Sequence, residues 1–145
     1  TPIYWGTGSV LMPPAAFLQK PLRWLRLIDE MGKLFPIGSL NPNFCYQRCV
    51  DTISEEDART LDLINWIFAL SAAGPVRHST VEAFFEKFGP QGFSRDALSP
   101  SFCMAECTVL ATCRQQGEPL SSKTVSGHQW HISGCSKRGG SGVQS

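Results

Sequence analysis

A cysteine and a histidine that lie far apart in the sequence could together perform nucleophilic catalysis. Cys45 follows a segment rich in proline and asparagine, at the predicted start of a helix, and His131 lies near the C-terminal end. The thiolate is the attacking form of cysteine, and a helix N-terminus and a neighbouring imidazolium both lower the pKa of a thiol. Taken alone, however, the pattern favours a buried free cysteine and an unrelated histidine, because any chain with both residues satisfies it.

Soft ligands in the second half of the chain offer a different chemistry, a structural zinc ion. The four candidate ligands are Cys107, Cys113, His131 and Cys135. Such a set suits tetrahedral zinc, but neither half has the Cys-x2-Cys spacing that is typical of a zinc knuckle. Small buried side chains are the simpler interpretation of these cysteines, and we therefore expect no metal and no cofactor.

The six cysteines also permit three disulfides. Cys45 and Cys49 share the spacing of Cys103 and Cys107, so the two pairs could form a double link between two helices. Disulfide-dense secreted folds usually have shorter chains and closer cysteines than this one. A secreted helical protein with three disulfides remains an alternative.

Composition places the chain among ordinary globular proteins. Its 145 residues are 42% apolar and 17% charged, with a formal net charge of +1. Binding to a nucleic-acid backbone normally needs a basic surface, and no apolar run is long enough to span a bilayer. We therefore expect neither direct nucleic-acid binding nor membrane insertion. Because the chain begins with Thr1 rather than methionine, we expect an excised domain or a processed product.

The order of the predicted elements indicates the α+β class. Capping residues and apolar periodicity predict helices at residues 21–32, from Asn43 onward, at 54–73 and at 80–88, with 35–43 as a loop. Short β-branched segments predict strands at 108–113, 123–126 and 130–133. Helices that precede strands favour N-terminal helices packed on a small antiparallel sheet. The predicted division is an extended arm at 1–14, one domain at 15–135 and a flexible tail at 136–145.

The tail contains a basic pair followed by two glycines and a serine. These residues are Lys137, Arg138, Gly139, Gly140 and Ser141. A flexible linker explains them, but two glycines also suit a narrow peptidase groove, where a Cβ atom would collide with the walls. The segment also resembles the C-terminal tail of ubiquitin.

Several segments in the same order resemble the replication-polyprotein endopeptidases of tymovirus-like plant viruses, which are related to ovarian-tumour (OTU) deubiquitinases. They are residues 92–98, 107–110 and 127–133 with the tail, so the resemblance spans roughly 40–141. It implies a papain-like or OTU-type fold with Cys45 as nucleophile and His131 as general base. Gly127, His128 and Gln129, followed by Trp130, would form an active-site loop, and residues 137–141 would be a self-cleavage site.

The resemblance implies a viral cysteine protease that cuts the replication polyprotein and removes ubiquitin at Gly-Gly or Gly-Ser junctions. Its partners would be the polyprotein and ubiquitinated proteins, and its location the host cytoplasm with viral replication complexes. Asn43 would assist the oxyanion or only cap its helix, and His128 competes with His131 for the role of base. The family loop has two prolines where this chain has His128 and Gln129. The alternative is a zinc-stabilised viral adaptor domain that binds a host protein.

Overall fold

Helices and strands alternate along the described part of the chain. The computed structural model describes residues 8–104, 106 and 109–113. The α-helices among them are α2 (Pro14–Gln19), α3 (Leu22–Gly32), α4 (Asn43–Thr52), α5 (Glu55–Ala58) and α6 (His78–Phe88). The strands are β1 (Ile37–Pro42), β2 (Trp66–Ala72), β3 (Leu98–Met104) and β4 (Val109–Cys113), and the 3-10 turns η1 (Gly89–Gln91) and η2 (Arg95–Ala97) precede β3.

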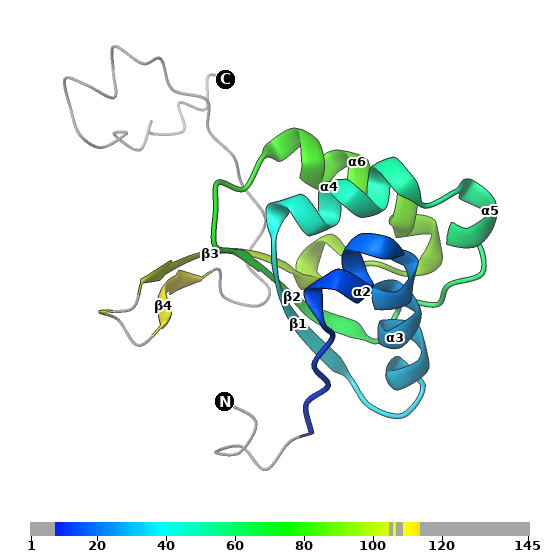
Figure 1. Ribbon diagram of the computed structural model, residues 1–145, viewed down its shortest axis with the longest axis horizontal. Helices are drawn as coiled ribbons and strands as arrows, with labels where there is room; N and C mark the ends of the chain where they lie inside the picture. The colour runs from blue at the N-terminus through cyan, green and yellow to red at the C-terminus, as the bar shows by residue number, and fades with distance from the viewer. Residues whose placement is uncertain (1–7, 105, 107–108, 114–145) are drawn as a thin grey trace, which may run out of the picture.

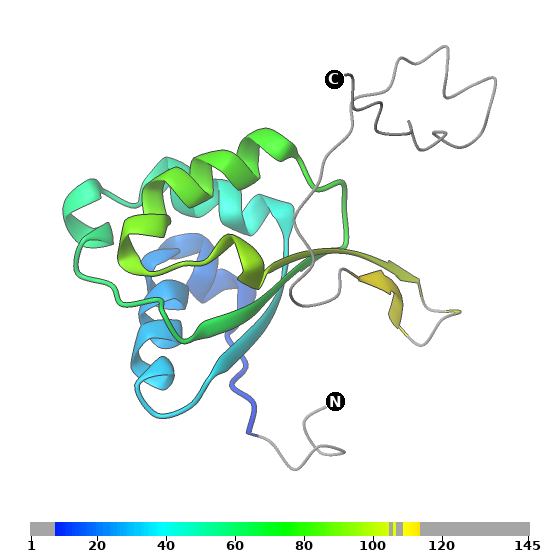
Figure 2. The same ribbon diagram turned by 180° about the vertical axis from the view of Figure 1, so that it is seen from behind.

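The four strands form one mixed sheet in the order β1-β2-β3-β4. β1 pairs with β2 and β2 pairs with β3, both in parallel, and β3 continues into an antiparallel pair with β4. Figures 1 and 2 show the helices on one side of the sheet and the β3–β4 hairpin projecting away from them. The parallel pairing brings the carboxyl ends of β1 and β2 to one edge of the sheet, beside the middle of β3.

This topology corrects the expected fold class. Helices followed by a small antiparallel sheet, as in a papain-like or OTU-type peptidase, would leave the first half of the chain without strands. Instead β1 and β2 lie within that half and pair in parallel. Parallel strands need a crossover between them, and here helices supply it, as in α/β folds.

Two local predictions failed for identifiable reasons. Residues 66–72 were expected to continue a helix from Ser54, but a short continuous apolar run fits a buried strand as well as a buried helix. Residues 35–43 were expected to form a loop because they contain two prolines. Pro42 is instead the last residue of β1. This strand is the outermost one on its side of the described sheet, and a missing N–H donor is tolerated there.

Other local predictions are confirmed. The Ser54 hydroxyl accepts a hydrogen bond from the Asp57 N–H at 3.1 Å and thereby caps α5. α3 ends at Gly32, and α4 begins at Asn43, as the sequence predicts. β4 covers most of the strand predicted at 108–113. The strands predicted at 123–126 and 130–133 lie outside the described residues.

An aromatic cluster forms the centre of the core between the sheet and the helices. The Trp66 ring, 1% exposed, lies edge-on to Trp24 with ring centroids 5.3 Å apart. It is stacked on Tyr46 at 6.3 Å and tilted against Phe93 at 4.8 Å. Phe84 of α6 closes the cluster at 6.1 Å. Residues from α3, α4, β2 and α6 thus meet at one tryptophan.

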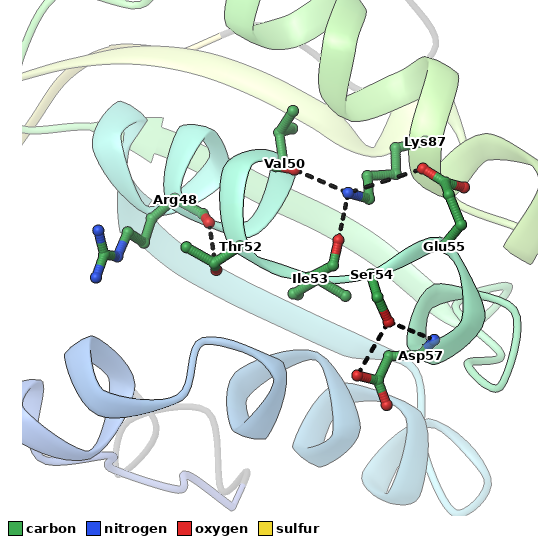
Figure 3. A network of polar contacts seen from close by, with 8 residues as sticks. All are labelled: Arg48, Val50, Thr52, Ile53, Ser54, Glu55, Asp57 and Lys87. Atoms are coloured by element: carbon green, nitrogen blue, oxygen red, sulfur yellow. Dashed lines mark hydrogen bonds and ion pairs between the residues drawn. The ribbon is translucent and has the colours of Figure 1, made fainter.

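A lysine joins α4 and α6. The Lys87 ammonium of α6 donates hydrogen bonds to the carbonyl oxygens of Val50, at 2.8 Å, and Ile53. Figure 3 shows that its Nζ atom lies between these carbonyls and the Glu55 carboxylate, 3.8 Å away. A cation at a helix C-terminus also interacts favourably with the helix dipole. Lys87 therefore fixes the end of α4 against α6.

The proposed division of the chain at 1–14, 15–135 and 136–145 stays a prediction. Residues 1–7 and 114–145 lie outside the part that the structure describes. Within that part, none of the helices is long and apolar enough to cross a membrane.

Candidate functional site

The carboxyl edge of the parallel strands is the candidate functional site. In open α/β sheets, ligands bind in the crevice beyond the carboxyl ends of the strands. Pro42 and Ala72, the last residues of β1 and β2, lie opposite each other in the register. β1 leads directly into α4, and β2 leads through the turn at residues 73–77 into α6. The starts of α4 and α6 therefore lie at this edge.

The turn after β2 has an uncommon backbone conformation. Ala73 has φ +59°, in the left-handed region that residues with a Cβ atom rarely adopt. Such a conformation costs of the order of 1 kcal/mol or more and persists only where the surrounding structure holds it. Gly74 and Pro75 follow, and the Gly74 backbone has open space on the side where a Cβ would lie. The turn therefore exposes its main chain at the edge of the sheet.

One side chain connects the start of α4 to the turn after β2. Asn43, the first residue of α4, accepts a hydrogen bond from the Arg77 N–H through Oδ1 at 3.1 Å. Its Nδ2 atom donates to the Thr80 hydroxyl at 3.4 Å, and this hydroxyl donates to Gln47 Oε1 at 2.7 Å. Asn43 does not cap its own helix with its side chain. It joins α4 to the turn that follows β2 and to the start of α6.

A buried hydroxyl group lies at the same edge. Ser71 is 1% exposed, and its Oγ atom has no hydrogen-bond partner among the described residues. In the sheet it lies opposite Asn41 of β1 and Pro100 of β3. Buried polar groups in native proteins are nearly always paired, so an unpaired one calls for a water or a ligand. The site thus combines this hydroxyl with the exposed main chain of residues 73–77.

Cys45, the expected nucleophile, lies on the first turn of α4, as predicted, but it is buried. Burial raises the pKa of its thiol from 9.0 to about 11, although a hydrogen bond with Asn41 partly opposes the shift. Burial likewise raises the pKa of Cys49, one turn later. At neutral pH Cys45 is therefore a protonated core side chain, which is not the form that attacks a carbonyl.

The residues expected to act with Cys45 lie outside the described part of the chain. They are Gly127, His128, Gln129, Trp130 and His131 and the tail residues 137–141. Cys107 and Cys135, which belong to the alternative zinc site, also lie outside it. Their placement relative to Cys45 therefore stays a prediction. Among the described residues, no group of three His, Cys, Asp or Glu side chains is arranged to hold a metal ion.

Alkylation of Cys45 is expected to be slow at neutral pH and to accelerate as the pH approaches 11, because burial raises its thiol pKa to about that value. The same shift is expected to lower stability between about pH 9 and pH 11, since the unfolded chain then releases the thiol proton first. Iodoacetamide labelling with peptide mass spectrometry measures the rate, and Cys103, half-buried on β3, is the faster-reacting control. Equal labelling of the two thiols at neutral pH would contradict the prediction.

Comparisons with known proteins identify the relatives of this chain. No family model matches it. The crystal structure of a fatty acid AMP ligase from Legionella pneumophila matches 81% of the chain with a TM-score of 0.76 and 40% sequence identity. A protein of Moorena producens, the medium-chain-fatty-acid–[acyl-carrier-protein] ligase JamA, is 40% identical over 117 residues. The homologues of this chain are fatty acyl-AMP and acyl-CoA ligases.

The similarity covers one part of each ligase. The chain spans 19% of the length of JamA and 20% of the Legionella enzyme. The long-chain-fatty-acid–AMP ligase FadD26 of Mycobacterium tuberculosis is 33% identical over 117 residues and is matched over 19% of its length. The adenylation domain of a keto-acid-selecting peptide synthetase has 24% identity and a TM-score of 0.67, which shows a shared fold. The described sheet is thus a segment of the adenylate-forming ligase fold.

These findings overturn the viral peptidase interpretation. The resemblance to tymovirus-like endopeptidases is wrong, because the homologues are ligases that match most of the chain in sequence and in fold. The protease and deubiquitinase activities, and the viral polyprotein and ubiquitin as partners, are wrong for the same reason. The papain-like or OTU-type fold is replaced by the mixed sheet of adenylate-forming ligases. The host-cytoplasmic location stays a prediction.

The sequence interpretation missed Ser71, Ala73 and Arg77 as site residues. All three were assigned to a helix or to the segment after it, because β2 was expected to be helical. A signal was present, since an apolar run of strand length followed by Gly74-Pro75 is compatible with a buried parallel strand and a turn. Asn43 was singled out, but for a peptidase role and not as a link to Arg77.

Proposed function

We propose that this chain is part of an adenylate-forming ligase that activates a fatty acid as its acyl adenylate. The observation that carries the proposal is the Legionella fatty acid AMP ligase, which has 40% identity and a TM-score of 0.76 over 81% of this chain. A second structure of fatty acyl-adenylate ligase from that organism contains acyl adenylate and pyrophosphate, with the same coverage and identity. The chain spans about a fifth of each of these enzymes. We therefore propose the activity for a full-length polypeptide that contains this sequence, and not for this segment by itself.

The reaction follows from those two ligands. A carboxylate oxygen of the fatty acid attacks the α-phosphorus of ATP and forms a new oxygen–phosphorus bond. The bond between the α-phosphorus and the oxygen that bridges it to the β-phosphorus breaks, and pyrophosphate leaves with the electron pair. The products are acyl adenylate and pyrophosphate, and no oxidant or reductant is needed.

The carboxyl edge of the sheet is the part of this chain proposed to contact the nucleotide. The exposed residues Ala73 and Gly74 of the turn offer main-chain N–H and C=O groups, and Ser71 offers a buried hydroxyl without a partner among the described residues. Hydrogen bonds of this kind orient small ligands at the carboxyl ends of parallel strands. The turn is connected to α4 through Asn43. The other contacts would come from the remaining four-fifths of the ligase.

Carrier proteins are the proposed acceptors of the activated acyl group. JamA and TtuA of Teredinibacter turnerae, 40% and 37% identical to this chain, are both named medium-chain-fatty-acid–[acyl-carrier-protein] ligases. FadD21 of Mycobacterium tuberculosis, at 35% identity, is named a putative fatty-acid–CoA ligase. Carrier proteins and coenzyme A both accept an acyl group on a thiol. A transfer assay that offers each acceptor separately therefore distinguishes them.

The full-length polypeptide is expected to form acyl adenylate from ATP and a fatty acid. Mass spectrometry of the quenched reaction measures the acyl adenylate, and a coupled assay measures pyrophosphate in parallel. Octanoate and palmitate are compared, and reactions without fatty acid or with benzoate are the controls. A second experiment replaces the matching segment of the Legionella ligase with the part of this chain that aligns with it, which is 81% of the chain. If neither protein forms acyl adenylate with either fatty acid, the proposal is wrong.

A further inference from the structure

Asn43 is the residue that connects the three elements meeting at the carboxyl edge of the sheet. It follows the last residue of β1, begins α4 and binds the final residue of the turn between β2 and α6. We infer that Asn43 is a positioning residue of the ligase site: its carboxamide holds the turn at residues 73–77 in the conformation that contacts the nucleotide. The inference rests on the proposed function and assigns to Asn43 a role that is separate from packing the core.

The turn needs to be held because its backbone is strained. Ala72 is fixed by pairing with β1, and His78 is fixed as the first residue of α6. Between them Ala73 adopts φ +59°. A left-handed residue with a Cβ atom persists only when its surroundings determine it. The hydrogen bond from the Arg77 N–H to Asn43 Oδ1, at 3.1 Å, fixes the end of the turn.

A chain of hydrogen bonds determines which end of the Asn43 carboxamide faces Arg77. The Thr80 hydroxyl uses its single proton to bind Gln47 Oε1 at 2.7 Å, so toward Asn43 it can only accept. Nδ2 of Asn43 therefore faces Thr80, at 3.4 Å, and Oδ1 faces the Arg77 N–H. Gln47 is oriented in turn because its Nε2 atom donates to Asp51 at 2.8 Å. Thr80 is buried, which protects the middle of this chain from competition by water.

The opposite edge of the sheet contains a matched control. Asn65 precedes β2 and donates a hydrogen bond from Nδ2 to the Gly32 carbonyl oxygen at 2.9 Å. Like Asn43, it makes a side-chain hydrogen bond to the main chain of a distant segment, but it is exposed and lies at the amino ends of the strands. A substitution at Asn65 therefore reports the general cost of losing such a link without changing the carboxyl edge.

The test compares acyl adenylate formation by three variants of the full-length polypeptide. Asn43→Ala is expected to lower kcat/KM about tenfold, because the variant loses the hydrogen bond that holds the turn at residues 73–77. Asn43→Asp keeps an acceptor for the Arg77 N–H and is expected to stay within about threefold of wild type. Asn65→Ala is expected to stay within about twofold, with a similar loss of thermal stability to Asn43→Ala.

Hydrogen exchange provides a readout that does not depend on activity. Mass spectrometry is expected to show faster exchange of the amides at residues 73–77 in Asn43→Ala, and unchanged exchange there in Asn65→Ala. Equal losses of kcat/KM in the two alanine variants, or an unchanged exchange rate in Asn43→Ala, would overturn the inference. If Asn43→Ala does not fold, Thr80→Val takes its place, because it removes the hydroxyl that orients the Asn43 carboxamide. Thr80→Val is then expected to lower kcat/KM at least threefold. Wild-type activity in Thr80→Val would overturn the inference. Absence of acyl adenylate with the wild-type protein is a different result, because it defeats the proposed function itself.

Discussion

Replacing Trp66 with alanine is expected to destabilise the protein by about 3–5 kcal/mol, the usual effect of removing a large buried aromatic side chain. The indole is 1% exposed and contacts the rings of Trp24, Tyr46, Phe84 and Phe93. The cavity would lie where four elements meet, so no single helix can move to fill it. A loss of this size is a large fraction of the stability of a typical domain.

Urea denaturation followed by far-ultraviolet circular dichroism measures the effect. Phe68→Ala on the same strand is the matched control, because Phe68 is 37% exposed and its truncation is expected to cost about 1 kcal/mol. Trp66→Phe keeps an aromatic ring but loses the indole N–H that donates to the Ser39 hydroxyl at 3.1 Å. It is expected to lie between the two alanine variants. Equal midpoints for Trp66→Ala and Phe68→Ala would show that the aromatic cluster does not form as described.

Replacing Lys87 with methionine is expected to destabilise the protein by about 2–4 kcal/mol, because each hydrogen bond from a charged donor contributes about 1.5–3 kcal/mol. Methionine preserves most of the aliphatic stem and removes the ammonium group. The carbonyl oxygens of Val50 and Ile53 would then lose their donor at the end of α4 (Figure 3). The Glu55 carboxylate, 3.8 Å from Nζ and 70% exposed, adds little because water screens it.

Lys20→Met is the control for Lys87→Met, since Lys20 is exposed and its replacement is expected to change stability by less than about 0.5 kcal/mol. Both variants are compared by urea denaturation at low and at moderate salt. The effect of Lys87→Met is expected to change little with salt, because its main partners are partly buried carbonyl oxygens rather than exposed charges. A loss that vanishes at moderate salt would mean that the ion pair with Glu55 dominates instead.

Features that depend only on residues close together in the chain could be predicted from the sequence. The Ser54 cap, the end of α3 at Gly32 and the start of α4 at Asn43 were predicted correctly. Caps and stops are satisfied within one turn of a helix, so local sequence is enough to specify them. The position of Cys45 on the first turn of α4 was predicted for the same reason.

The sequence could not determine which apolar runs become strands. Residues 66–72 have no period that separates a buried strand from a buried helix, and pairing with β1 and β3 decides between them. Short motifs also misled the functional interpretation, because many unrelated chains contain a cysteine, a later histidine and a Gly-Gly tail. Similarity over 117 residues carries far more information than such motifs.

The candidate site and the protonation state of Cys45 were decided by tertiary structure alone. Asn43, Ser71 and Arg77 belong to separate segments, and only parallel pairing of β1 with β2 brings them to one edge. A helix N-terminus would lower the pKa of Cys45, but the packing around α4 buries the thiol and raises the pKa to about 11. Desolvation depends on what the rest of the chain places around a group, and the neighbouring residues in sequence do not specify it.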